Sequence, residues 1–128
     1  MATPPAYAVA VTERDPDCLF CKIAATEIPA DIVHQDEHVI AFRDISPQAP
    51  THVLIIPKKH VSTINDLEDG DEELVGRLFL AAKRIAGKEG LAEKGYRVTM
   101  NCMEGAGQSV FHSHLHLLGG RRFSWPPG

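Results

Sequence analysis

The stretch FHSHLHLL, residues 111–118, alternates histidine with serine and leucine. Residues two apart share one face of an extended strand, whereas on a helix they point in nearly opposite directions. The spacing therefore predicts a strand over residues 113–118. This strand should present a row of imidazoles on one face: His112, His114 and His116. The apolar residues between them should lie on the other face, toward a core: Phe111, Leu115 and Leu117.

A row of imidazoles suits two kinds of chemistry. Imidazole is the commonest metal ligand in proteins, so the three histidines could bind a catalytic metal ion. A neutral imidazole can also attack phosphorus while its neighbour donates a proton. The preceding loop, EGAGQS at residues 104–109, has glycine N–H groups and the Ser109 hydroxyl, which suit an anion. This loop favours phosphate chemistry and leaves the metal-dependent enzyme as the alternative.

The rest of the chain indicates the α+β class. Residues 18–26 predict a short helix, and residues 31–35 and 38–43 predict a hairpin that turns at Asp36-Glu37. Residues 52–56 and 96–101 predict two further strands. Residues 71–88 predict a long helix, with an aspartate at its start and an apolar stripe: Leu74, Val75, Leu78, Phe79, Ala82, Ile85 and Ala86. The expected sheet has five antiparallel strands, and a second copy of the chain would cover one of its edges.

Composition restricts the class of protein. The 128 residues fit one domain, which we expect over residues 17–128 after a flexible tail at residues 1–16. The net charge of −4 argues against a broad surface for nucleic acid but not against a pocket for one phosphate. No apolar run approaches the roughly 20 residues that span a membrane. Three cysteines do not make a disulfide framework, so we expect a cytoplasmic location, with the nucleus as a second one.

Residues 112–118 resemble the histidine-triad (HIT) pattern, which is His-x-His-x-His followed by two apolar residues. Further segments resemble the Hint branch of that family: FRDISPQAPTH at 42–52, IPKKH at 56–60, Asn101, GQS at 107–109, GGR at 119–121 and WPPG at 125–128. The resemblance covers residues 18–128. It implies a homodimer whose two sheets join into one of ten strands. It also implies hydrolysis of purine nucleoside 5′-phosphoramidates at their P–N bond, through a nucleotidyl-histidine intermediate. Acyl-adenylates are a second implied class of substrate, and the reaction would need no cofactor.

The resemblance assigns roles residue by residue. His114 is the expected nucleophile, His116 binds phosphate oxygens, His112 orients His114, and His52 is a fourth active-site histidine. Ser109 would hold the phosphate or the leaving group. Asp44 would accept the ribose 2′- and 3′-hydroxyls, as a carboxylate can. The other expected nucleotide contacts are Phe20, Ile28, Phe42 and Ile45 at the base, and Asn101, Gly107 and Gln108 toward the ribose and phosphate. Trp125 would reach the site of a neighbouring protomer.

Cys18 and Cys21 have the spacing of zinc ligands, although two cysteines on a short helix are more often free thiols. Some HIT proteins hold a structural zinc ion with such a pair and two histidines, which here would be His60 and His112. Two other functions remain open within the resemblance. They are a dinucleoside polyphosphate hydrolase and a nucleotide-binding regulatory or adaptor protein.

Overall fold

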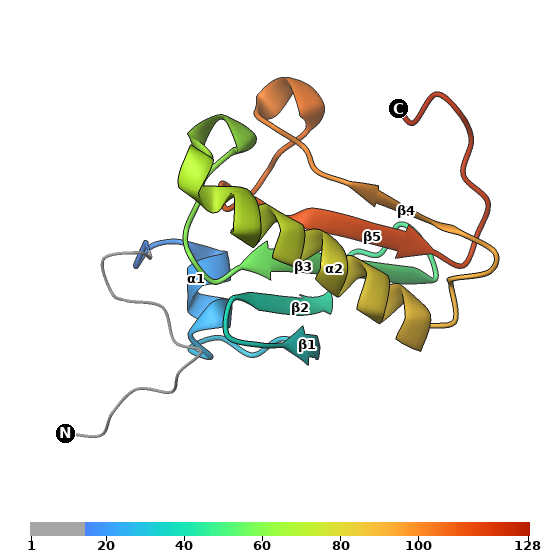
Figure 1. Ribbon diagram of the computed structural model, residues 1–128, viewed down its shortest axis with the longest axis horizontal. Helices are drawn as coiled ribbons and strands as arrows, with labels where there is room; N and C mark the ends of the chain where they lie inside the picture. Colours follow the sequence, from blue (N-terminus) through green and yellow to red (C-terminus); the bar gives the residue numbers. More distant parts are fainter. Residues whose placement is uncertain (1–14) are drawn as a thin grey trace.

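The computed structural model describes residues 15–128, so the expected tail lies outside the described part except for Asp15 and Pro16. Over these residues the chain forms two α-helices, five strands and three short 3-10 turns (Figure 1). In chain order they are α1 (Leu19–Ala24), β1 (Ile32–Gln35), β2 (Val39–Arg43), β3 (Thr51–Pro57), η2 (Ile64–Asp66), η3 (Asp69–Asp71), α2 (Glu72–Lys88), β4 (Tyr96–Thr99), η4 (Glu104–Ala106) and β5 (Leu115–Gly119).

The five strands form one sheet in the order β1-β2-β3-β5-β4, and every neighbouring pair is antiparallel. The expected α+β class and five-stranded antiparallel sheet are confirmed. β1 and β4 are the edges of the sheet. β5 lies between β3 and β4, so the histidine segment runs through the interior of the sheet, next to the strand that carries His52.

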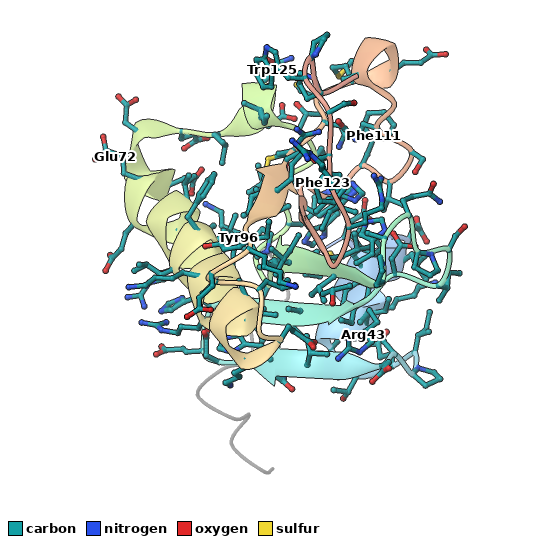
Figure 2. The ribbon with its side chains drawn as sticks, turned by 90° about the vertical axis from the view of Figure 1, so that its right-hand side faces the viewer. Arg43, Glu72, Tyr96, Phe111, Phe123 and Trp125 are labelled. Carbon is teal, nitrogen blue, oxygen red and sulfur yellow. The ribbon has the colours of Figure 1, made fainter. Side chains whose placement is uncertain are left out.

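The two helices cover opposite faces of the sheet, with α2 on one side and α1 on the other (Figure 2). Strand residues alternate between the two faces, as the period of two requires. Val53, Ile55 and Leu117 pack under α2, while Leu54 and Ile56 pack with Phe20 and Ile23 of α1. The side of the sheet that faces α1 also carries His52 and His116. The chemistry-bearing residues are thus separated from the larger core under α2.

The long helix begins at Glu72, close to the predicted residue 71, but its cap differs from the prediction. The Asp71 carboxylate makes no cap to α2; it accepts from the Glu68 N–H and from Lys59, both at 2.9 Å. The predicted apolar stripe was wrong at Phe79, which is 51% exposed, while Ala81 is fully buried instead. The buried face is therefore rotated slightly from the predicted one.

The histidine segment enters the sheet two residues later than predicted. β5 begins at Leu115, so His112 and His114 precede the strand and only His116 lies within it. The partner strand β3 ends at Pro57, which has no N–H to donate. The Pro57 carbonyl accepts from the His112 ring at 2.7 Å, and the Ser113 N–H bonds to the Val61 carbonyl at 2.7 Å.

Leu115 and Leu117 lie in the core under α2 as predicted. Phe111, predicted to join them, is 45% exposed because it lies beyond the paired part of the strand.

The hairpin between β1 and β2 forms without glycine, through three residues rather than the predicted two. One oxygen of the Asp36 carboxylate accepts the backbone N–H groups of His38 and Val39, at 2.8 and 2.9 Å. An aspartate that binds the backbone ahead of it mimics a turn.

Within residues 15–128, neither helix has the length and the apolar composition that a membrane span requires.

Candidate active site

A cavity of about 690 Å³ lies between α1 and the sheet face that carries the histidines. Its floor is apolar, with Phe20 and Ile23 from α1 and Phe42 and Leu54 from the strands. One end is polar, and its groups come from three segments of the chain: Asp44, Ser109, His114 and His116. An apolar cleft that ends in a few polar groups is the usual form of a small-molecule site.

The structure brings eight of the predicted site residues together around this cavity: Phe20, Ile28, Phe42, Asp44, Ile45, Ser109, His114 and His116. Ile45 is fully exposed on the rim of the cavity. The sequence analysis missed Leu19, Ile23, Leu54 and Val110. Two of them had a usable signal: Ile23 follows Phe20 by three residues on a helix, and Leu54 follows His52 by two on a strand.

Four predicted nucleotide contacts do not line the cavity of the single chain: Asn101, Gly107, Gln108 and Trp125. The Gln108 side chain donates to the Ser62 and Val110 carbonyls and accepts from the Met103 N–H, so it joins its own loop to the segment that follows β3. Trp125 is 83% exposed, and Figure 2 shows it far from Arg43 at the cavity wall.

His114 is held by a single backbone contact that fixes its chemistry. Its Nδ1 lies 2.8 Å from the His112 carbonyl oxygen. A carbonyl can only accept, so Nδ1 carries the proton and Nε2 of the neutral ring keeps its lone pair. Burial lowers the pKa of His114, which favours the neutral form. The ring is packed edge-on against Phe20, with centroids 5.2 Å apart. His114 is therefore an oriented, uncharged imidazole with a free lone pair.

His116 lies next to the His114 ring, and His52 lies next to His116. The His114 and His116 ring centroids are 4.9 Å apart, and His52 Nε2 lies 2.9 Å from His116 Nδ1. Burial lowers the pKa of His116 to about 4 and also lowers that of His52. Asp44 places a carboxylate oxygen 3.5 Å from His52 Nε2. The polar end of the cavity thus combines neutral imidazoles with one carboxylate.

His112 does not face the cavity; it faces the cysteines. Its Nδ1 lies 3.3 Å from Cys18 Sγ and 3.5 Å from Cys21 Sγ. His60 Nδ1 lies 3.3 Å from both Cys21 Sγ and His112 Nδ1. The four residues predicted as metal ligands therefore converge on one point, and this Cys/His cluster could hold a metal ion. Burial raises the pKa of the Cys21 thiol to about 11, so a metal would displace its proton.

The three histidines of the row do not converge on one metal. His112 faces the Cys/His cluster, while His116 faces His52. Asp44, His52 and His116 also lie within 4.8 Å of one another. The hydrogen bond between the two rings accounts for that proximity without an ion. The row as a whole is therefore not arranged as the ligand set of one metal ion.

Comparisons with known proteins agree with this geometry. The family model described as "HIT domain" matches residues 25–123. A purine nucleoside phosphoramidase of Escherichia coli is 54% identical over 105 residues, which are 82% of this chain and 88% of that protein. A HIT-like protein of Synechococcus elongatus is 49% identical over 88% of this chain and 97% of its own length. The solved structure of a HIT family hydrolase from Legionella pneumophila is 60% identical, with a TM-score of 0.86, over 88% of this chain and all of that one.

Proposed function

The chain belongs to the HIT domain family, and from this premise we propose that it is a hydrolase of purine nucleoside 5′-phosphoramidates. The observation that carries the proposal is the polar end of the cavity. There His114, whose Nε2 keeps its lone pair, has the ring of His116 beside it, and both line the apolar cleft together with Ser109. The similar E. coli protein bears the name of this activity.

The cleft suits a purine nucleoside. Phe20 and Phe42 meet edge to face with centroids 5.4 Å apart and form an apolar wall for the base, and Ile45 on the rim would cover it. The Asp44 carboxylate would accept the two ribose hydroxyls. Its Oδ1 already accepts the Ser46 N–H at 2.8 Å, which orients the group.

The reaction would proceed in two displacements at phosphorus, because a covalent intermediate divides one difficult step into two easier ones. His114 Nε2 attacks phosphorus, the P–N bond breaks with its electron pair on nitrogen, and the leaving amine takes a proton from solvent. Water then attacks the nucleotidyl-histidine, the bond to His114 breaks with its electron pair on Nε2, and the water proton returns to solvent as the nucleoside monophosphate is released. Ser109 and His116 would stabilise the charge that develops on the phosphoryl oxygens.

The decisive experiment is hydrolysis of adenosine 5′-phosphoramidate by the wild-type protein and by His114→Ala. The variant should lose at least about 10³-fold in kcat/KM, since the covalent route disappears. His38→Ala, at a histidine outside the cavity, is the matched control and should retain full activity. An inactive wild type would refute the function, and an active His114→Ala would refute the nucleophile.

We propose that the Cys/His cluster binds a structural zinc ion. With Zn–S near 2.3 Å and Zn–N near 2.0–2.1 Å, tetrahedral ligand atoms lie about 3.3–3.8 Å apart, which fits the separations of the cluster. Both imidazoles also have the outer contact that metal-bound histidines use. His112 Nε2 donates to the Pro57 carbonyl at 2.7 Å, and His60 Nε2 lies 3.0 Å from Ser62 Oγ. Zinc would join α1 to the sheet and take no part in the reaction.

We propose further that two copies pair through the β4 edge. β4 pairs with β5 on one side only, and next to it lies an apolar groove of about 190 Å³ lined by Phe79 of α2 and by Met100, which follows β4. Phe79 is 51% exposed, and Tyr96 on β4 itself is 37% exposed. Pairing of two β4 strands would give the ten-stranded sheet and cover these side chains. The tail with Trp125 would then extend to the partner's site.

A further inference from the structure

His52 lines no part of the cavity, yet it is buried directly behind His116. One contact of its ring is unambiguous. The backbone N–H of Gln48 donates to His52 Nδ1 at 3.0 Å. A backbone N–H can only donate, so Nδ1 of His52 has no proton. The neutral ring therefore carries its proton on Nε2.

The surroundings of His52 Nε2 agree with this tautomer. Two groups lie near that nitrogen: His116 Nδ1 at 2.9 Å and a carboxylate oxygen of Asp44 at 3.5 Å. The carboxylate can only accept, so a bare Nε2 would be repelled by it. The N–H of His52 accordingly donates to His116 Nδ1, and Nδ1 of His116 is an acceptor. In the neutral ring of His116, the proton is then on Nε2.

Nε2 of His116 has no hydrogen-bond partner within residues 15–128, and the ring lines the cavity beside His114. Burial of both rings keeps His52 and His116 neutral near pH 7. The two rings therefore present chemically different nitrogens: Nε2 of His114 has a lone pair, and Nε2 of His116 has a proton. Attack at a phosphoryl group needs this combination, because the nucleophile must be bare and the phosphoryl oxygen needs a donor.

We propose that His52 is a positioning residue whose tautomer, fixed by the backbone N–H of Gln48, holds His116 as an Nε2–H donor toward the phosphoryl group of the substrate. The inference rests on the proposed function for the identity of that substrate. It assigns to the loop of residues 44–48 a second task besides ribose binding. The chain of contacts is Gln48 N–H to His52 Nδ1, then His52 Nε2–H to His116 Nδ1.

The first test is NMR of the wild-type protein labelled with ¹⁵N on its histidine rings, at pH 7. Protonated and bare ring nitrogens are distinguished by their shifts, and a coupling across the hydrogen bond should join His52 Nε2 to His116 Nδ1. We expect a proton on Nε2 in His52 and His116 and on Nδ1 in His114. Spectra of His52→Gln and His116→Gln assign the signals. A proton on Nδ1 of His116, or no coupling between the two rings, would overturn the inference.

The second test compares His52→Gln with His52→Met. The two side chains have similar length, but only glutamine can donate an N–H to His116. Outer residues that orient a functional histidine typically contribute about 10- to 100-fold. We expect His52→Met to lose that much in kcat with little change in KM, and His52→Gln to recover most of it. A purely structural role would affect both variants alike, and equal losses or full activity in both would overturn the proposal.

The NMR result separates this inference from the proposed function. A wild-type protein that cleaves no phosphoramidate but shows the expected ring protons would refute the function and leave the tautomers standing. A protein that cleaves the phosphoramidate but has His116 protonated on Nδ1 would support the function and refute the tautomers. The wild-type spectrum also decides the question if either His52 variant fails to fold.

Discussion

The carbonyl oxygen of His112 lies 2.8 Å from Nδ1 of His114, while the imidazole of the same His112 faces Cys18 and Cys21. One residue thus holds the His114 ring with its backbone and contributes to the Cys/His cluster with its side chain. The two roles can be separated by mutation, because any residue at position 112 retains the carbonyl.

The first prediction follows from this division. His112→Asn should lose the bound metal ion but retain the hydrogen bond that fixes His114. We expect kcat/KM to fall by at most about 100-fold, the range for residues that act through another group. In the same assay, kcat/KM of His114→Ala should fall by at least about 10³-fold. Metal content and phosphoramidate hydrolysis, both measured on folded protein, check the prediction. Equal losses in the two variants would contradict it.

Removal of the metal should affect stability before chemistry. Protein purified without a chelator should contain close to one zinc ion per chain, and Cys21→Ser should contain little. Binding of a metal to the folded state alone stabilises that state. We expect Cys21→Ser to unfold at least about 5 °C lower, since 1 kcal/mol corresponds to a few degrees in a domain of this size.

Cys102→Ser is the matched control for that experiment, because Cys102 lies outside the cluster. It should retain its zinc. Chelation of the wild type should likewise lower the unfolding temperature while the fraction that remains folded still hydrolyses substrate. Zinc-free wild-type protein as isolated would refute the structural zinc ion. Activity that stops at once on chelation, with the fold intact, would instead support a catalytic metal.

Acid should destabilise the fold through its buried imidazoles. The pKa of His116 is about 4 in the folded chain, below the ordinary value of about 6.5 expected in the unfolded chain. Between these values the unfolded state binds more protons, so the free energy of unfolding falls as the pH drops from 6.5 toward 4. Burial lowers the pKa of His52 as well, so His52 contributes to the same loss of stability in acid.

Urea denaturation at several pH values measures this linkage. The slope of the unfolding free energy against pH reports the difference in bound protons between the unfolded and folded states. Between pH 6.5 and 4.5 this difference should be smaller in His116→Gln than in the wild type, by up to about one proton. An unchanged slope in His116→Gln would mean that His116 is not a buried neutral base.

Much of this site follows from residue spacing, and the exceptions have physical causes. Alternation placed Leu115 and Leu117 in the core and the histidines opposite them. It could not reveal that pairing of β5 with β3 stops at Leu115 and Ile55, so that His112 turns toward the cysteines and Phe111 is left exposed. Helical periodicity placed Leu78 and Ile85 in the core but included Phe79, because the core does not occupy the full width of the predicted stripe. Periodicity does not distinguish a core residue from one that a partner would cover.

The resemblance had a different limit. It implied that Gln108 contacts the nucleotide, and in the structure the Gln108 side chain bonds to backbone groups of Ser62, Met103 and Val110. Spacing cannot show how a side-chain amide is shared among neighbours. Residue types likewise indicate that His52 and His116 are functional, but the direction of the hydrogen bond between them depends on the Gln48 N–H.

Asp44 should confer a preference for ribose. A hydrogen bond to a charged group contributes about 1.5–3 kcal/mol, so Asp44→Ala should lower kcat/KM for adenosine 5′-phosphoramidate about 10- to 150-fold. The wild type should discriminate against the 2′,3′-dideoxy analogue by a similar factor. The two losses should not add when variant and analogue are combined, since each removes the same contact. Additive losses would show that Asp44 acts through His52 alone and does not bind the ribose.

The last prediction concerns the edge strands. A dimer formed through β4 and the adjoining groove should be disrupted by Phe79→Glu, because two copies would then bury like charges near one another. Analytical ultracentrifugation should find the wild type as a dimer and the variant largely as a monomer. Ile32→Glu is the matched control, because Ile32 is 40% exposed on β1, at the opposite edge of the sheet. It should remain dimeric. If Ile32→Glu dissociates and Phe79→Glu does not, the copies pair through β1 and not through β4. A monomeric wild type would contradict pairing through either edge.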